Sequence, residues 1–193
     1  KLPALQDALQ MIHFPATLAE AGVARRRFAF EDLFFIQLAH LRARAELLRE
    51  PGARITLSSE EREALITSLP FTLTASQRRS VEEIFSDFEK GSPMNRLLEG
   101  DVGSGKTAVA ALAAFAAHQK NMQTVCLAPT EVLARQHYAT ISEISRERNI
   151  TVGLLVGAEA RMRHRDDLEA KVSKKTLFSE IAAGNIDIQI GTH

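Results

Sequence analysis

Apolar side chains recur at helical spacing between residues 28 and 41 of this 193-residue chain. Charged residues gather behind them, between residues 42 and 50, as in a helix segment that faces solvent. Pro51 and Gly52 follow, and both residue types end helices. The pattern therefore predicts a helix that runs to about residue 50.

The predicted helix carries a cluster of aromatic side chains, Phe28, Phe30, Phe34 and Phe35. Such a cluster can form a stacking platform for nucleic-acid bases. Here the rings recur at helix spacing without interleaved basic residues, which is more typical of a packed core. We therefore predict that these rings are buried.

Two further helices are indicated by capping boxes, in which a hydroxyl residue precedes Glu or Gln by three positions. Ser58 and Glu61 form the first pair, and Thr74 and Gln77 form the second. In each pair the hydroxyl accepts an N–H of the first helical turn, and the longer side chain bonds back to the cap. We expect one helix to begin after Ser58 and another after Thr74.

Residues 70–193 differ from the helical appendage at residues 1–69, because short apolar runs now alternate with helical segments. This order predicts an α/β fold, namely a parallel sheet with right-handed crossovers and helices on both faces. The predicted strands are residues 96–99, 124–128, 151–156 and 186–190. The predicted helices are residues 108–117, 130–148 and 161–183, the last with a possible break near Ser173.

Residues 100–107 read GDVGSGKT and fit the phosphate-binding P-loop pattern G-x-x-x-x-G-K-[ST]. Glycines let the backbone curl so that successive N–H groups point at a phosphate in front of a helix. Lys106 would contact the β- and γ-phosphates, and the Thr107 hydroxyl would bind Mg²⁺. The predicted phosphate-binding residues are Gly100, Asp101, Val102, Gly103, Ser104, Gly105, Lys106 and Thr107.

Composition limits the other function classes. The 24 basic and 24 acidic residues cancel, so nucleic-acid binding must rest on local patches. The single cysteine, Cys126, lies in an apolar run and is predicted to be a buried thiol, which fits a reducing compartment. The sequence contains no signal peptide or membrane-spanning run, so we expect a cytoplasmic protein without a membrane partner.

Four loops at the carboxyl ends of the predicted strands are expected along one rim, since parallel sheets bind ligands there. They are the P-loop, residues 129–131, Gly157 and residues 191–193. Thr130 begins a helix, so its hydroxyl either caps that helix or contacts a phosphate. Gln77 is equally open: it completes a capping box, or its amide pairs with the N7 acceptor and N6 donor of adenine.

The ordered motifs resemble the first half of a superfamily 2 helicase motor, and the spelling of the P-loop is most similar to the RecG family. Two alternatives remain. One is a transcription-repair coupling factor, whose motor usually carries an aromatic residue where Ser104 stands, and the other is a P-loop module that does not translocate. Residues 26–34 also resemble the helical segment that joins the wedge domain of RecG to its motor. The motifs that carry the resemblance are Phe71-x-Leu73-Thr74-x-x-Gln77, residues 93–107, residues 128–136 and residues 190–193.

The resemblance implies an ATP-dependent DNA helicase or translocase that remodels branched DNA in repair and recombination, in the bacterial cytoplasm at the nucleoid. It implies a P-loop NTPase (RecA-like) fold with ATP and Mg²⁺ as cofactors and with Lys106 and Thr107 as catalytic residues. Gln77 would recognise adenine, with Phe71 or Leu73 near the base. The implied partners are branched or duplex DNA, a wedge domain and a second motor lobe. The implied DNA contacts are Pro129, Thr130, Arg135, Gly157 and Thr192.

The sequence departs from the family in one respect. A motor of this type needs an apolar strand that ends in Asp-Glu, which holds Mg²⁺ and positions the attacking water, and residues 1–193 contain none. We therefore expect the lobe to be incomplete at its C-terminal end. We also expect this chain to bind nucleotide weakly by itself, while hydrolysis requires the parent protein.

Overall fold

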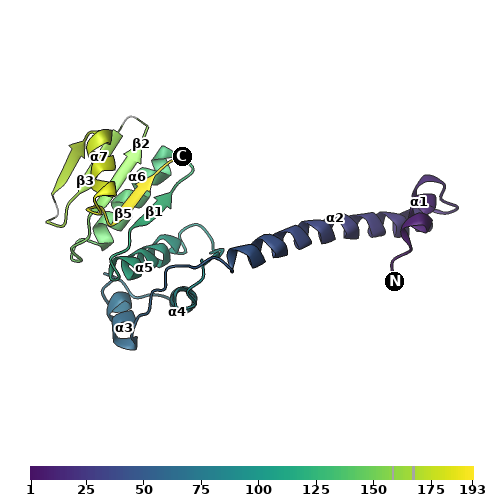
Figure 1. Cartoon of the computed structure of the whole chain (residues 1–193), viewed down its shortest axis with the longest axis horizontal. Helices are drawn as coiled ribbons and strands as arrows, with labels where there is room; N and C mark the ends of the chain where they lie inside the picture. Colours follow the sequence, from purple (N-terminus) through teal and green to yellow (C-terminus); the bar gives the residue numbers. More distant parts are fainter. Residues whose placement is uncertain (158, 167) are drawn as a thin grey trace. The chain divides into compact units, whose positions relative to one another are not determined.

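The computed structural model describes residues 1–157, 159–166 and 168–193 (Figure 1). Its internal contacts group the chain into two units, Lys1–Pro51 and Gly52–His193. Residues 52–69 fall in the second unit, because Leu65 shares its core with Phe115. The assignment of residues 1–69 to one appendage stays a prediction.

Two helices make up the first unit, α1 (Leu5–His13) and α2 (Leu18–Leu47). Thr17 caps α2 by accepting the backbone N–H of Glu20 at 3.2 Å, so the helix begins well before the aromatic cluster. α1 packs against α2, and Ala8 and Ala24 are fully buried. Small side chains at these positions let the two helices approach closely.

The prediction that the aromatic cluster is buried is wrong for this unit. The side chains of Phe30, Phe34 and Phe35 are each about half exposed. The rings of Phe30 and Phe34 stack with their centroids 5.9 Å apart, so they contact each other rather than a core. Helical spacing alone could not identify this, because it gives the face on which residues lie but not what covers that face.

Both predicted capping boxes are formed, at the start of α3 (Ser59–Thr67) and of α4 (Ala75–Phe88). In each box the cap hydroxyl accepts a backbone N–H, and the Glu or Gln side chain accepts the N–H of the cap residue. Two otherwise unpaired donors of each helix are satisfied in this way. Local sequence therefore fixes where α3 and α4 begin.

A five-stranded sheet forms the centre of the second unit, in the order β1-β5-β2-β3-β4 (Figure 1). The strands β1, β5 and β2 run parallel, as predicted, whereas β3 and β4 continue the sheet as an antiparallel extension. The strand bounds are β1 Thr124–Leu127, β2 Val152–Val156, β3 Glu159–Arg163, β4 Glu169–Val172 and β5 Ile188–Gly191.

Helices cover both faces of the sheet, which confirms the predicted layers. Successive residues of a strand point to opposite faces. Leu154 of β2 belongs to the core cluster that contains Tyr138 of α6 (Glu131–Ile144). Leu155, the next residue, packs in a separate cluster with Leu177 of α7 (Lys174–Ala182). α6 and α7 therefore lie on different sides of the sheet.

The alanine-rich helix α5 (Lys106–His118) is almost entirely buried in the main core. Ala111, Leu112 and Ala116 have no exposed surface, and Phe115 has almost none. Small side chains let α5 pack closely against its neighbours, including α3 and α4. The helix that carries the P-loop at its first turn is thus held rigidly.

Two predicted elements are wrong, one of them in part. Residues 161–183, predicted as a charged helix with a possible break near Ser173, form β3, β4 and α7 in the part that the structure describes, and α7 begins directly after Ser173. Their high charge hid a two-residue alternation, in which Ala160 and Met162 are buried on either side of the exposed Arg161. Residues 96–99, predicted as a strand, form no strand. Arg96 instead pairs with Glu83 and Asp87 of α4.

Cys126 is half-buried in β1 rather than fully buried. Its side chain packs against the main core, and this burial raises the pKa of the thiol. Within the described residues, no helix combines the length and apolarity needed to cross a bilayer.

Candidate nucleotide-binding site

The predicted P-loop forms a tight turn that leads directly into α5. Gly103 and Gly105 have φ angles of +81° and +80°, in the left-handed region that glycine tolerates best. Gly105 is also the cap residue of α5. A Cβ at this position would lie 2.3 Å from Nε2 of Gln77, so a side chain there would collide with α4. Backbone conformation therefore favours glycine at residue 105, and a larger residue would also displace the Gln77 amide.

The first turn of α5 suits an anion. No side chain caps this helix, so its first N–H groups lack the partners that the caps of α3 and α4 provide. Aligned peptide dipoles add a partial positive charge at the same place. Gly100, Ser104, Lys106 and Gln77 line a cavity of about 130 Å³ here, beside the loop. The geometry fits the phosphate site that the sequence predicts.

Lys106 lies inside the loop that it belongs to. Its Nζ donates to the carbonyl oxygens of Gly100 at 2.7 Å and of Asp101 at 2.8 Å. Both acceptors are uncharged, so phosphate oxygens can replace them with a stronger charge-assisted bond. The structure thus holds the ammonium next to the space that a phosphate would fill. Thr107 follows in the first turn of α5, half-buried.

Gln77 forms the capping box that the sequence left open, and it makes a second contact that the sequence did not show. Its Oε1 accepts the N–H of Thr74 at 2.8 Å and completes the capping box. Its Nε2 donates to the carbonyl of Ser104 at 2.7 Å, in the middle of the P-loop. The side chain therefore connects the start of α4 to the phosphate loop. Recognition of adenine by the same amide stays a prediction.

We expect Gln77→Glu to weaken nucleotide binding about tenfold while leaving the fold intact. Glutamate retains the acceptor that caps α4, but it loses the donor to Ser104 and sets a carboxylate against a carbonyl oxygen. Titration with a fluorescent nucleotide measures the change. Glu61→Gln, at the equivalent position of the α3 capping box, is the control and should bind nucleotide normally. Unchanged affinity in Gln77→Glu would show that the contact with Ser104 is incidental.

Phe71, predicted to lie near the base, is about half exposed, whereas Leu73 packs against the main core. The exposed ring precedes α4, on the same stretch of chain as Gln77. Its assignment to the base stays a prediction.

Four of the five predicted nucleic-acid contacts share one edge of the sheet. Pro129 and Thr130 follow β1, Gly157 follows β2, and Thr192 follows β5. These strands are parallel neighbours, with Gly191 opposite both Leu127 and Leu155, so their carboxyl ends meet. The P-loop is bonded to α4 through Gln77. The structure thus presents a phosphate clamp at the start of α5 and a rim of loops that follow β1, β2 and β5.

Thr130 caps α6, since its Oγ1 accepts the N–H of Leu133 at 3.3 Å. Because Thr130 is exposed, this cap does not prevent contact with a phosphate. Both interpretations of this residue therefore remain compatible with the geometry, and its contact with DNA stays a prediction.

Arg135 lies in a different setting from the one expected of a DNA contact. It forms ion pairs with Glu131 and Glu159, so its charge is already balanced by carboxylates. Gly157 supports this arrangement, because a Cβ there would lie 2.3 Å from a carboxylate oxygen of Glu131. The four-residue spacing of Glu131 and Arg135 is typical of an ion pair along a helix, so the sequence could have predicted this pair. The second partner of Arg135, Glu159, could be found only from the folded structure.

Residues 74–192 match the DEAD/DEAH box helicase family. Over its whole length the chain is 40% identical to the ATP-dependent DNA helicase RecG of Thermotoga maritima and 41% identical to that of Bacillus subtilis. Over 98% of its length it is 38% identical to that of Synechocystis sp.. It covers 24%, 27% and 22% of these relatives, about a quarter of their length. Because the family match spans more than half of the chain and contains the phosphate clamp and the rim, the chain belongs to the DEAD/DEAH box helicase family.

Proposed function

We propose that this chain is the nucleotide-binding part of an ATP-dependent DNA helicase motor of the RecG type, which remodels branched DNA in repair and recombination. The observation that carries the proposal is the glycine-lined turn at the start of α5, with Lys106 held inside it. A turn of this kind binds phosphate without regard to the base. Two relatives that match this chain over its whole length are named ATP-dependent DNA helicases.

The residues of the turn divide the work of holding ATP. Backbone N–H groups at the start of α5 would bind phosphate oxygens, and Lys106 would leave its two carbonyl partners for the β- and γ-phosphates. The Thr107 hydroxyl would hold Mg²⁺, which neutralises charge on the phosphates when it is bound. Gln77 would sense the occupied loop through Ser104, because the two are hydrogen-bonded.

The rim of strand-end loops would contact DNA. Its groups are a helix start at Thr130, glycine backbone at Gly157 and a hydroxyl at Thr192. Groups of this kind bind the sugar-phosphate backbone rather than base edges, and they fit a motor that moves along any sequence. Since residues 1–193 contain no strand that ends in Asp-Glu, water activation would come from other parts of the protein. A wedge domain and a second motor lobe are the partners we infer.

The test uses the complete protein that contains this chain. We expect ATP hydrolysis to be slow alone and strongly stimulated by a forked DNA substrate, with unwinding of the fork in the same conditions. Hydrolysis without stimulation by any DNA would favour the module that binds nucleotide and does not translocate. Stimulation that requires RNA polymerase on the template would favour a transcription-repair coupling factor instead.

We expect Thr130→Ala to weaken DNA binding about tenfold for every sequence, because the lost contact is to phosphate. The same change removes the cap of α6 and should cost about 1 kcal/mol of folding stability. Binding to several duplexes of unrelated sequence, measured by fluorescence anisotropy, gives the affinity, and thermal unfolding gives the stability.

Thr130→Asp separates the two effects. Aspartate is a good helix cap, so stability should be retained, but its charge would repel phosphate and DNA binding should still fall. If Thr130→Asp binds DNA as tightly as the unmodified protein, the role of Thr130 is that of a cap and the DNA contact is wrong.

A further inference from the structure

A carboxylate lies between two loops of the rim that would contact DNA. Glu131 follows Thr130 at the start of α6, and its Oε1 would lie 2.3 Å from a Cβ added at Gly157. The side chain therefore reaches from the loop after β1 to the loop after β2. It is 50% exposed, so a negative charge faces solvent where the proposed function requires a DNA phosphate.

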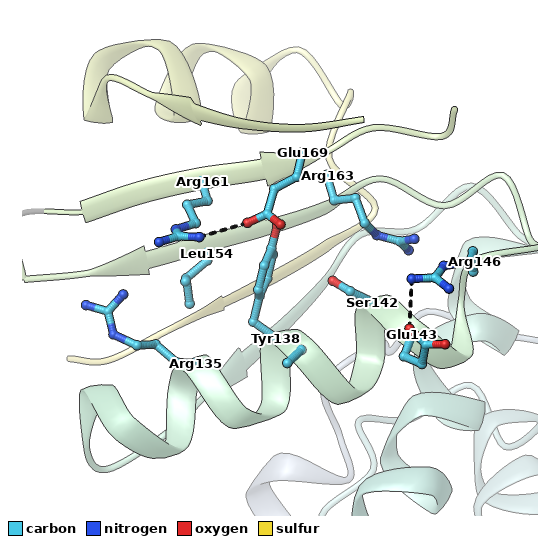
Figure 2. Close-up of a pocket in the computed structure, with 10 residues that line it drawn as sticks. Arg135, Tyr138, Ser142, Glu143, Arg146, Leu154, Arg161, Arg163 and Glu169 are labelled. Carbon is cyan, nitrogen blue, oxygen red and sulfur yellow. Dashed lines mark hydrogen bonds and ion pairs between the residues drawn. The ribbon is translucent and has the colours of Figure 1, made fainter. Parts of the chain in front are cut away.

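The same carboxylate is one end of a row of alternating charges. Oε2 of Glu131 pairs with Nη2 of Arg135 at 3.4 Å, and Nη1 of Arg135 pairs with Glu159. Glu159 also pairs with Arg161, which pairs with Glu169 at 3.1 Å. Figure 2 shows Arg135 extending from α6 and Arg161 from β3, with the bond from Arg161 to Glu169 marked. Three carboxylates thus face two guanidinium groups, and both arginines are already paired.

The two partners of Arg135 differ in how firmly they are held. The Glu159 side chain is only 18% exposed and also pairs with Arg161. The Glu131 side chain is 50% exposed and pairs at the longer distance of 3.4 Å. Exposed ion pairs contribute little to stability, so another anion can replace Glu131 on the guanidinium. Nη2 of Arg135 is therefore an exchangeable position, while the bond from Nη1 to Glu159 keeps the guanidinium oriented.

We propose that Glu131 competes with the DNA backbone for Arg135 and so limits how tightly the rim binds DNA. Without DNA, the carboxylate occupies Nη2 and lies against Gly157. When DNA binds, a backbone phosphate replaces the carboxylate at Nη2, and Glu159 keeps Arg135 in position. A phosphodiester carries one negative charge, as a carboxylate does, and accepts the same charge-assisted hydrogen bond. This inference rests on the proposed function, because it requires the rim to contact DNA.

The test is a titration of a fluorescent DNA duplex with the complete protein at increasing salt concentration. We expect Glu131→Gln to bind the duplex about fivefold more tightly at low salt, because glutamine neither repels phosphate nor competes for the guanidinium with a full charge. The gain should shrink as salt rises, since salt screens charges that lie near the surface. A gain that does not depend on salt would be structural in origin and would overturn the proposal.

Glu143→Gln is the matched control. Glu143 lies near the other end of α6 and pairs with Arg146 of the following turn at 2.9 Å, so the same charge is removed away from the rim. Its affinity for the duplex should stay unchanged. An equal gain in the variants of Glu131 and Glu143 would reflect the net charge of the protein and would overturn the proposal.

A double variant shows whether Glu131 acts through Arg135. Arg135→Gln alone should weaken DNA binding and lower the slope of log affinity against log salt by about one, because one phosphate contact is lost. When Glu131→Gln is added to Arg135→Gln, the gain in affinity should be clearly smaller than in the unmodified protein. An undiminished gain means that Glu131 acts only by repelling DNA, and the competition for Arg135 is then wrong.

Thr130→Asp, measured with the same duplex, separates this inference from the proposed function. If Thr130→Asp weakens DNA binding while Glu131→Gln does not tighten it, DNA contacts the rim and only the inference about Glu131 is overturned. If neither variant changes the affinity, the rim does not contact DNA, and the inference is overturned together with the DNA contacts of the proposed function.

Discussion

Replacing Lys106 by alanine is expected to lower the DNA-stimulated ATP hydrolysis of the complete protein by about a hundredfold or more, the usual loss when one charge-stabilising group is removed from a reacting centre. The ammonium is already inside the loop, bonded to the carbonyls of Gly100 and Asp101. Its removal therefore takes away a positive charge at the place where negative charge develops during phosphoryl transfer. Steady-state hydrolysis with saturating forked DNA measures the loss.

Lys120→Ala is the control for this experiment. Lys120 follows the C-terminal end of the same helix and pairs with Glu61 at 3.1 Å, so its removal takes an equal charge from the other end of α5. Partly exposed ion pairs contribute little to stability, and hydrolysis should be nearly unchanged. Thermal unfolding of both variants shows whether the fold is retained. Normal turnover by a folded Lys106→Ala protein contradicts the role of Lys106.

Local signals allowed the sequence to predict the parts of the site that depend on neighbouring residues. The capping boxes at Ser58 and Thr74 are formed by side chains three residues away, and the turn at residues 100–107 requires only glycines and a following helix. In these places short-range hydrogen bonds decide the conformation. The predicted starts of α3, α4 and α5 accordingly agree with the structure to within a few residues.

Features that depend on distant partners could not be predicted in the same way. The link from Gln77 to Ser104 joins residues 27 positions apart, and Glu159 meets Arg135 across 24 positions. The strands β3 and β4 have the composition of a charged helix, and pairing of β3 with β2 and of β4 with β3 selects the extended form. Long-range packing overrides local propensity in these cases, as it does when Arg96 pairs with α4.

Gly105→Ala is expected to lower nucleotide affinity by more than tenfold, through a collision as well as through backbone strain. The left-handed φ of +80° costs an alanine about 1–2 kcal/mol. The added methyl group would also lie 2.3 Å from Nε2 of Gln77, which must leave its bond with Ser104. Gly184→Ala isolates the strain, because Gly184 has a φ of +78° with no atom within 4 Å of the added carbon. It should lose stability while its nucleotide affinity stays unchanged.

A double-mutant cycle shows whether the collision is the cause. If Gly105→Ala acts by displacing Gln77, then Gln77→Ala removes the amide that the added methyl group meets, and the loss of affinity in the double variant should be smaller than the sum of the two single losses. Nucleotide titration of the four proteins gives the coupling. Strictly additive losses would mean that the two residues act independently, and the collision with Gln77 would then not explain the loss in Gly105→Ala. A clear coupling would show that Gln77 connects the P-loop to the start of α4, so that nucleotide binding in the loop also affects α4. Its Nε2 is bonded to Ser104 and is the nearest atom to a Cβ added at residue 105.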